Sequence, residues 1–290
     1  MPDPVVASAV RECVAVARTY GVVCDDPLVL KESANVVVHL RPAPLVAKVS
    51  ASTRLVRPDV ESWLDREIAA ARHVRAAGLP TAQPSDLVPP VVHNGPEGAV
   101  MSFWQHVPHD RDALMSSEEL GAMLASLHEV LATIPPQTPV LHTPLADIER
   151  YVDRAPSVGV ADADVSRLRA AYERVTDSND VLAGPVQTLH GDAHPGNLLR
   201  APAGWVWCDY EDTCAGPTAW DLATMADSDR VDARAALTAY DLPYDEAQVA
   251  AHIELRKLHV TVWALVFAER LSQHRDLAAD KLGAVDRIAR

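Results

Sequence analysis

Hydrophobic residues in the first part of the chain recur first with the period of a helix and then with the period of strands. Over residues 4–19 the apolar side chains lie three or four positions apart, which predicts an amphipathic helix that ends at Gly21. Three short runs rich in Val and Leu follow, over residues 28–31, 36–41 and 45–50. The connections between them are short, which favours antiparallel pairing. We therefore predict a small antiparallel sheet behind the opening helix.

The helical period returns over residues 59–77 and dominates the second half of the chain. A Pro-rich loop over residues 80–90 and one further strand over residues 99–103 follow this helix. The remaining predicted helices begin at Ser116, cover residues 145–154 and 163–176, begin again at Thr218 and fill residues 245–290. This order of elements predicts an α+β protein with a sheet-containing lobe over residues 1–105 and a mostly helical lobe over residues 106–290.

Polar residues flank two short strands in the central stretch, residues 187–221. Asp192 is followed five residues later by Asn197, and Asp209 ends an apolar run that begins at Trp205. A turn over residues 201–204 separates the two strands. Such a hairpin would bring Asn197 and Asp209 to the same open end.

These residue types suit metal-assisted phosphoryl transfer. Amide and carboxylate oxygens are the ligands that Mg²⁺ takes from proteins, and a second carboxylate can orient a hydroxyl and accept its proton. The spacing Asp-x-x-x-x-Asn of Asp192 and Asn197 matches the rule for the catalytic loop of kinases. Any one of these residues alone would be better explained as part of a polar surface loop, but their combination favours the chemical interpretation.

The string HGDAHPGNLL followed by WCDYED resembles the signature of the aminoglycoside phosphotransferase and choline kinase superfamily. The resemblance extends over nearly the whole chain, although only these two motifs are specific. It implies a two-lobed protein-kinase-like fold, with Asp192 as the catalytic base and Asn197 and Asp209 as ligands of Mg²⁺. Asp221 resembles the structural aspartate that anchors the catalytic loop in this family, and helix capping is an equally physical account of it. We assign His128 no chemical role.

Lys48 is the most informative residue of the first lobe, because it lies in the apolar run Leu45–Val49. A charge in such a strand costs free energy unless it is paired, or unless it points to solvent from an edge strand. In the kinase interpretation Lys48 binds the α and β phosphates of the nucleotide, and a carboxylate orients it. Glu67 lies on the apolar face of the predicted helix over residues 59–77, so we predict that it pairs with Lys48.

Four further residues are candidates for nucleotide contacts. The first hairpin has no glycine-rich phosphate loop, so Ser33 and Asn35 would have to cover the phosphates with side-chain and backbone donors. The resemblance implies that adenine binds backbone groups of the segment that joins the lobes. It makes Ser102 and Trp104 candidates, although an aromatic residue at such a position is more often part of the core.

Composition narrows the class of partner. The net charge of −14 and the isoelectric point near 5.2 disfavour nucleic acid and anionic membranes as partners. This charge would suit a cationic acceptor, although ordinary solubility explains it equally well. The four cysteines show no metal-binding spacing, and we find neither a signal peptide nor an apolar run of membrane-spanning length. We therefore expect free thiols and a cytoplasmic protein, and we make no prediction of the oligomeric state.

The sequence thus predicts an ATP-dependent, Mg²⁺-dependent kinase that phosphorylates a hydroxyl of a small molecule. An aminoglycoside-like antibiotic is the first expectation for the acceptor, which would make the protein a resistance enzyme. A neutral or zwitterionic metabolite or a macrolide is the second, and a peptide or protein kinase, or a nucleotide-binding module without turnover, is the third. Several acids of the helical segments could line the acceptor site, although each alone is typical of a solvated helix face. They are Asp147, Glu149, Asp153, Asp162 and Asp164.

Overall fold

The computed structural model describes residues 3–177 and 179–289, and their packing divides the chain into two units. The first, which we call the sheet unit, contains the chain up to Ala113 together with Leu198–Glu211. The second, the helical unit, contains Leu114–Asn197 and the chain from Asp212 onwards. The sequence suggested a single cut after residue 105, whereas the packing also joins a short stretch from the middle of the chain to the sheet unit.

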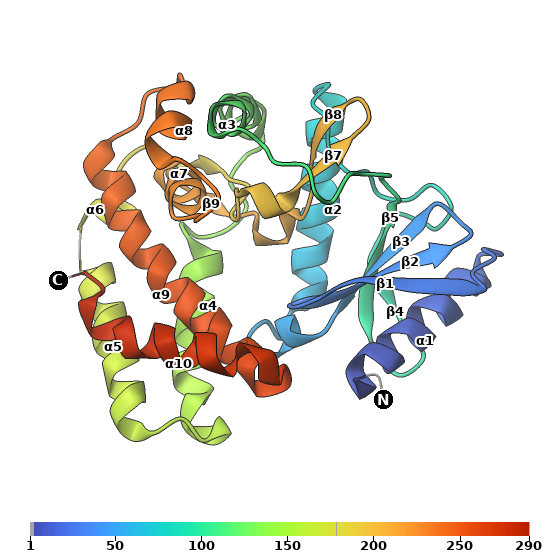
Figure 1. The fold of residues 1–290 in the computed structure, drawn as a ribbon, viewed down its shortest axis with the longest axis horizontal. Helices are drawn as coiled ribbons and strands as arrows, with labels where there is room; N and C mark the ends of the chain where they lie inside the picture. Colours follow the sequence, from blue (N-terminus) through green and yellow to red (C-terminus); the bar gives the residue numbers. More distant parts are fainter. Residues whose placement is uncertain (1–2, 178, 290) are drawn as a thin grey trace. The chain divides into compact units, whose positions relative to one another are not determined.

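The sheet unit is built on a five-stranded antiparallel sheet with the order β1-β2-β3-β5-β4 (Figure 1). Its strands are β1 (Asp26–Glu32), β2 (Asn35–Arg41), β3 (Leu45–Ser50), β4 (His93–Asn94) and β5 (Val100–Gln105). The four predicted strands are confirmed. The sequence missed β4, because two residues are too few to show a period.

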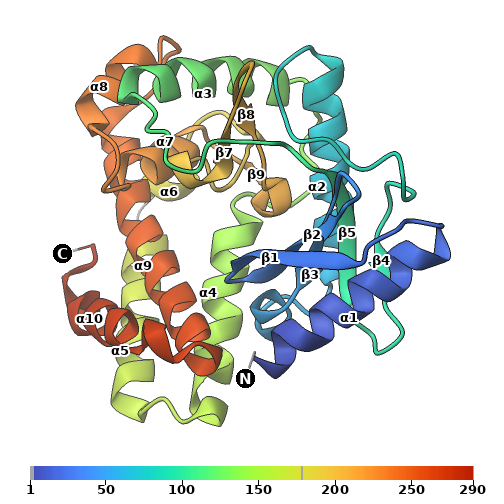
Figure 2. The same cartoon turned by 45° about the vertical axis from the view of Figure 1, so that its right-hand side comes forward.

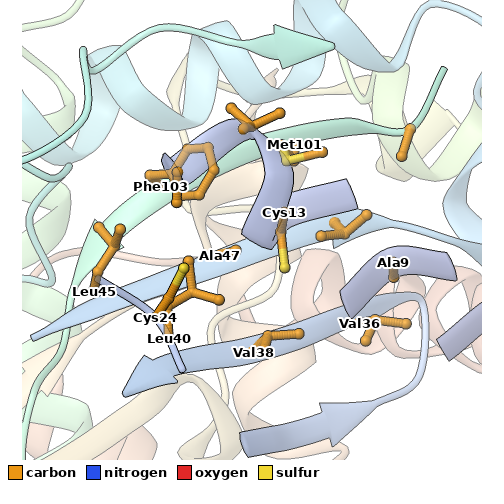
Figure 3. Close-up of a cluster of buried hydrophobic side chains, with 14 of the residues drawn as sticks. Ala9, Cys13, Cys24, Val36, Val38, Leu40, Leu45, Ala47, Met101 and Phe103 are labelled. Atoms are coloured by element: carbon orange, nitrogen blue, oxygen red, sulfur yellow. The ribbon is translucent and has the colours of Figure 1, made fainter. Parts of the chain in front are cut away.

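Helix α1 (Pro4–Thr19) covers one face of this sheet, as Figure 3 shows. It begins at the capping residue Asp3, whose side chain accepts a hydrogen bond from the backbone N–H of Val5. Alternate residues of the central strands point towards the helix and form a buried apolar core with it. This core includes Ala9, Cys13, Val36, Val38, Leu40, Leu45, Ala47, Met101 and Phe103.

The opposite face of the sheet packs against helix α2 (Val60–Ala76). Leu64 of this helix and Val100 of β5 belong to a second, smaller apolar cluster. Side chains alternate between the faces of a strand, so Lys48 lies on the face opposite to its neighbours Ala47 and Val49. The same period that builds the core under α1 therefore directs the only charged residue of β3 towards α2.

A hairpin of β7 (Leu198–Ala201) and β8 (Gly204–Trp207) completes the sheet unit, and the register pairs Leu198 with Trp207. The hairpin is attached through Trp207, whose backbone N–H donates to the carbonyl of Pro80 and whose carbonyl accepts from Ala82 N, at 3.1 and 2.8 Å. The predicted loop, turn and hairpin are confirmed.

The helical unit consists mainly of helices that pack around the long helix α9 (Figure 2). The helices are α3 (Ser117–Leu131), α4 (His142–Arg154), α5 (Asp162–Thr176), α6 (Asn179–Leu182), α7 (Ala219–Ala226), α8 (Ala233–Ala239), α9 (Glu246–Arg270) and α10 (Arg275–Ala284). A two-stranded sheet of β6 (Gln187–Thr188) and β9 (Ala215–Gly216) accompanies them. Across the described residues, no helix is both long and apolar enough to cross a membrane.

Helix boundaries in this unit follow the predictions closely, with four differences, one of which is the unpredicted short helix α6. Ser116 caps α3 by accepting a hydrogen bond from the backbone N–H of Glu119, as predicted. Helix α4 begins at His142, inside the segment that we predicted as a Pro-rich connector, because proline is tolerated in a first helical turn. The sequence also missed α8, and the predicted helical stretch over residues 245–290 is interrupted at Leu271.

Candidate active site

Three carboxylates surround the buried ammonium group of Lys48 in the sheet unit. The Nζ atom lies 2.9 Å from Glu67 Oε1 and 2.7 Å from Glu211 Oε2, and it also donates a hydrogen bond to Asp209 Oδ1. The side chains of Lys48 and Glu67 are only 8% and 2% exposed. The structure thus brings together Lys48, Glu67 and Asp209 as the sequence suggested, and it adds Glu211.

The protonation states of Lys48 and Glu67 follow from their burial and from the charges of their neighbours. Burial raises the pKa of Glu67 to about 8; the ammonium of Lys48 opposes this change, and the charges of Asp209 and Glu211 reinforce it. Burial alone would lower the pKa of Lys48, but the same three carboxylates raise it well above its usual value. Lys48 is therefore charged, and three acids share its ammonium group.

Two more basic residues approach the outer carboxylates of this cluster. Lys31 Nζ lies 3.8 Å from Asp209 Oδ2, on a side chain that is 53% exposed. The buried guanidinium of Arg57 lies 3.6 Å from Glu211 Oε1 and 4.1 Å from the centre of the Trp63 ring. Glu211 was not predicted from the sequence. Its position two residues after Asp209, within the motif WCDYED, could have indicated it.

The backbone of Asp209 has a positive φ of 68°, which lies in the left-handed region. Aspartate is one of the few residues other than glycine that adopt this conformation at modest cost. The chain therefore turns directly after β8. This turn follows Trp207, which holds the hairpin to the rest of the sheet unit, so the position of the Asp209 carboxylate beside Lys48 is set by the hairpin.

The two predicted phosphate contacts at the first hairpin differ in their surroundings. Ser33 lies between β1 and β2, and its backbone N–H donates to the carbonyl of Asn35 at 3.1 Å. The Asn35 side chain is buried: its Nδ2 donates to Glu211 Oε2 at 2.7 Å and its Oδ1 accepts from Thr53 Oγ1 at 2.8 Å. The side-chain amide of Asn35 therefore braces the carboxylate cluster, and a contact of either residue with phosphate stays a prediction.

Ser102 and Trp104, the candidates for contacts near adenine, both lie in β5 and are both buried. The indole Nε1 of Trp104 donates a hydrogen bond of 2.8 Å to Ser102 Oγ. Ser102 pairs with Lys48 across the sheet, so β5 runs beside the lysine strand. The side chains of Ser102 and Trp104 thus hydrogen-bond to each other. A contact of this segment with adenine stays a prediction.

In the helical unit, Asp221 at the start of α7 fixes the loop that precedes Asp192. Its two carboxylate oxygens accept hydrogen bonds of 2.9 Å from the backbone N–H groups of His190 and Gly191. His128 Nε2 lies 3.0 Å from Asp221 Oδ2, and all of these groups are buried. Of the two accounts that the sequence left open for Asp221, the structure supports the loop anchor rather than the helix cap. His128 acts as part of that anchor.

Gly191 is required by a close approach of two backbone segments. Its φ is +89°, and a Cβ atom added there would lie 1.9 Å from the carbonyl oxygen of Asp212. The carbonyl of Gly191 accepts a hydrogen bond of 2.7 Å from the indole of Trp220. No other residue fits this position, so the loop before Asp192 has a single backbone path.

The carboxylate of Asp192 accepts hydrogen bonds from three side chains. Arg256 Nη2 lies 2.8 Å from Oδ1, while Asn197 Nδ2 and His194 Nε2 lie 3.0 and 3.2 Å from Oδ2. The Nδ1 atom of His194 accepts from the backbone N–H of Gly196, so the ring donates to Asp192 through its Nε2–H. These contacts hold both oxygens in fixed positions.

Burial alone would raise the pKa of Asp192, but the charges of His194 and Arg256 outweigh it and hold this pKa well below its usual value. Asp192 is therefore a deprotonated and weakly basic carboxylate. Arg256 could not be predicted from the sequence, because it lies on α9, far from the motif along the chain.

Asn197 and Asp209, the predicted ligands of Mg²⁺, each carry an oxygen of the kind that this ion takes from proteins. Asn197 is buried, and its Nδ2 donates to the carbonyl and to the carboxylate of Asp192, which leaves its Oδ1 for a cation. In the described part of the chain, no cluster of three or more His, Cys, Asp or Glu side chains is arranged to hold a metal. That the two residues bind one Mg²⁺ ion stays a prediction.

The acidic residues that we considered for the acceptor site do not share one environment. Asp147 is fully buried, where it accepts hydrogen bonds from Trp263 Nε1 at 3.1 Å and contacts His259 Nε2 at 3.2 Å. It is therefore neither a solvated acid nor an accessible one. Asp153 and Asp164 pair with arginines of α5. Glu149 and Asp162 are exposed, as the solvated-face interpretation expects.

Comparison with known proteins gives the same fold. The model of the phosphotransferase enzyme family matches residues 32–252. Among solved structures, an amicoumacin kinase in complex with AMP-PNP, Ca²⁺ and amicoumacin has a TM-score of 0.68 at 13% identity, covering 90% of this chain and 88% of its own. The GDP and kanamycin complex of APH(2")-IIia has a TM-score of 0.67 at 11% identity, with 95% and 97% covered. A microcompartment-associated aminopropanol kinase has a TM-score of 0.66 at 18% identity, with 94% and 97% covered.

The family match spans well over half of the chain, and the structural likeness extends over nearly all of it. It confirms the α+β, two-lobed protein-kinase-like fold, with a small antiparallel sheet in the first lobe and mainly helices in the second. The chain belongs to the phosphotransferase enzyme family, and it is a kinase that acts on a hydroxyl group.

Proposed function

We propose that this protein transfers the γ-phosphoryl group of ATP to a hydroxyl of a small molecule, with Asp192 as the catalytic base. The observation that carries the proposal is the environment of Asp192. It is deprotonated, both of its oxygens are fixed by named donors, and its loop is anchored to Asp221. A fixed carboxylate of low basicity suits phosphoryl transfer, in which the base orients the hydroxyl and receives its proton late.

The remaining residues would divide the work between binding the donor and neutralising its charge. Lys48, oriented by Glu67, would hold the α and β phosphates, and Glu211 adds a second buried partner that limits the motion of the ammonium group. Asn197 and Asp209 would hold Mg²⁺, which supplies charge neutralisation on the β and γ phosphates when bound. Ser33, Asn35, Ser102 and Trp104 stay candidates for positions around the nucleotide.

The bond changes are those of a simple displacement. The oxygen of the acceptor hydroxyl forms a bond to the γ phosphorus while the bond from that phosphorus to the β–γ bridging oxygen breaks. ADP leaves, and the proton of the hydroxyl passes to a carboxylate oxygen of Asp192. No group other than the two substrates is consumed.

For the acceptor, an aminoglycoside-like antibiotic and a neutral or zwitterionic metabolite are both supported. The similar structures include an amicoumacin kinase, a complex with kanamycin and an aminopropanol kinase, and the three compounds carry amines and hydroxyl groups. The low isoelectric point of this chain is compatible with a cationic acceptor. Arg256 lies beside the base and bears on this choice.

The experiment that tests the proposal separates binding of the donor from transfer. In the variant Asp192→Asn we expect ADP release in the presence of an accepted hydroxyl compound to fall by at least about a hundredfold, the size of a lost general base. Calorimetric binding of ATP with Mg²⁺ should stay within about threefold of the wild type, because Asp192 is not among the residues assigned to the nucleotide. Near-normal turnover in this variant would show that Asp192 is not the base.

A further inference from the structure

Helix α9 brings a guanidinium group to the proposed base. The neighbours of Arg256 on this helix, Leu255 and Leu258, are completely buried, so the backbone at this position is fixed in the core of the helical unit. The side chain of Arg256 is 14% exposed. Its Nη2 lies 2.8 Å from Asp192 Oδ1, and its Cζ lies 6.0 Å from the centre of the Trp220 ring. Arg256 is thus held on two sides.

The remaining donors of this guanidinium are available. An arginine carries five N–H groups in a planar fork, and the contact with Asp192 uses one nitrogen. Among the residues that the structure describes, no acceptor is found for Nε or Nη1 of Arg256, and neither atom is buried without a partner. Both atoms are therefore open to solvent beside the carboxylate that would receive the acceptor hydroxyl.

We propose that Arg256 is the residue that determines acceptor specificity: its free N–H groups bind a carboxylate of the acceptor while Asp192 orients a hydroxyl a few bonds away. This inference rests on the proposed function and names its substrate class, a hydroxy acid such as a hydroxyl-bearing amino acid. Guanidinium and carboxylate groups match in geometry and charge, and hydrogen bonds between charged groups are about twice as strong as neutral ones.

The same position disfavours a polycation. A sugar with several ammonium groups would have to place its hydroxyl against Asp192 while its charges lie close to a fixed guanidinium, and like charges at such distances repel. The carboxyl group of Asp227 also lies within the electrostatic reach of Arg256. A fixed guanidinium beside the base suits an acceptor that carries a carboxylate better than one with several amines.

A simpler role for Arg256 would be to hold Asp192 in place. That role would affect every hydroxyl acceptor equally, because each of them meets the same carboxylate. Binding of an acceptor carboxylate instead changes the ratio between two acceptors that differ only in that group. The ratio of kcat/KM for a carboxylate and for its carboxamide therefore isolates the proposed contact, because any change in Asp192 cancels in it.

The test measures ADP release by the full chain with Mg²⁺ and ATP, for the pairs L-serine and L-serinamide and L-homoserine and L-homoserinamide, with kanamycin as the polyamine. In the wild type we expect at least one carboxylate to exceed its carboxamide in kcat/KM by about tenfold to a hundredfold, the effect of one charge-assisted hydrogen bond. In Arg256→Ala this ratio should fall to about one, chiefly through a higher KM for the carboxylate. Arg256→Lys keeps the charge and should retain part of the ratio.

Lys257→Gln is the matched control. It removes one positive charge at the next position of the same helix, on a more exposed side chain that pairs with Glu254. We expect its ratio to equal that of the wild type. Thermal unfolding of every variant checks that the fold is kept, and Arg256→Lys carries the test if Arg256→Ala does not fold.

Three results would overturn the inference: stimulation by kanamycin above every carboxylate, an unchanged ratio in both Arg256 variants, or no stimulation by any of the carboxylates. Failure of the proposed function is recognised separately. It would appear as turnover that survives in Asp192→Asn, whatever the ranking of the acceptors.

Discussion

At the scale of single residues, the chain concentrates buried charge at two points and compensates it differently. Lys48 is surrounded by acids, whereas Asp192 is surrounded by donors. A buried charge is tolerated only when it is paired, so Lys48 and Asp192 each depend on specific neighbours.

The Lys48 cluster makes a direct prediction about stability. Lys48→Met removes the ammonium group that Glu67, Asp209 and Glu211 share and leaves these acids without that partner. We expect the free energy of unfolding to fall by about 3–5 kcal/mol, as when one member of a buried ion pair is removed. Denaturant unfolding of the purified variant measures this change.

Lys31→Met is the matched control for that measurement. Lys31 also approaches Asp209, at 3.8 Å, but its side chain is 53% exposed. Solvent screens an exposed pair, so the expected loss is within about 1 kcal/mol. Equal losses in the two variants would show that burial does not distinguish the lysines.

At the scale of the elements, side-chain period predicted much of the site, and contacts between distant elements supplied the rest. Lys48 and Glu67 each lie on a strand or helix face whose period is visible in the sequence, so their pairing could be predicted. The contact between Arg256 and Asp192 could not be predicted. Helix α9 is apolar on several sides, and no sequence pattern near Arg256 links it to Asp192. Strand β4 was missed because its two residues show no period.

Close contact between α3 and α8 depends on a glycine and gives a second prediction. A Cβ atom at Gly121 would lie 2.1 Å from the carbonyl oxygen of Ala236 on α8. We expect Gly121→Ala to destabilise the fold by about 1–3 kcal/mol through overpacking, although alanine favours a helix by about 1 kcal/mol. Gly283→Ala in α10 is the control, because an added Cβ meets nothing within 4 Å there. That variant should be neutral or slightly more stable, and a stabilised Gly121→Ala would contradict the packing argument.

Helix α9 also carries a buried histidine that makes stability depend on pH. His252 is fully buried, its Nδ1 lies 2.7 Å from the carbonyl of Gln248, and burial lowers its pKa. Below about pH 6.5 the unfolded chain gains a proton at this residue that the folded chain resists. The folded state therefore loses stability as the pH falls through that value, by at most about 1.4 kcal/mol per pH unit.

His252→Gln removes this titration and provides the test. We expect the stability of the variant relative to the wild type to be higher at pH 5 than at pH 8, measured by denaturant unfolding at both values. The comparison at pH 8 serves as the control for packing differences, because the wild-type ring is neutral there. A difference between variant and wild type that is the same at both pH values would contradict the argument.

At the scale of the whole molecule, the sheet unit is discontinuous along the chain, and this gives the last prediction. The stretch Leu198–Glu211, which contains the hairpin of β7 and β8, contributes Asp209 and Glu211, two of the three carboxylates around Lys48. It also satisfies the backbone of the Pro80–Ala82 segment through Trp207. The fragment that ends at Ala113 therefore keeps a buried lysine with one partner and loses its hairpin contacts. We expect it to lack the near-ultraviolet dichroism of a packed protein.

Adding the hairpin should restore folding. The backbone N–H of Asp110 donates to the carbonyl of Arg200 at 2.9 Å, so a short Gly/Ser linker can join Ala113 to Leu198 without strain. We expect the joined fragment, which ends at Glu211, to unfold cooperatively, and we expect this to be lost when Trp207 is replaced by Ala. A fragment without the hairpin that unfolds just as cooperatively would show that α1, α2 and the five-stranded sheet suffice. In that case the hairpin would be needed for the carboxylates around Lys48 and not for the fold of the sheet unit.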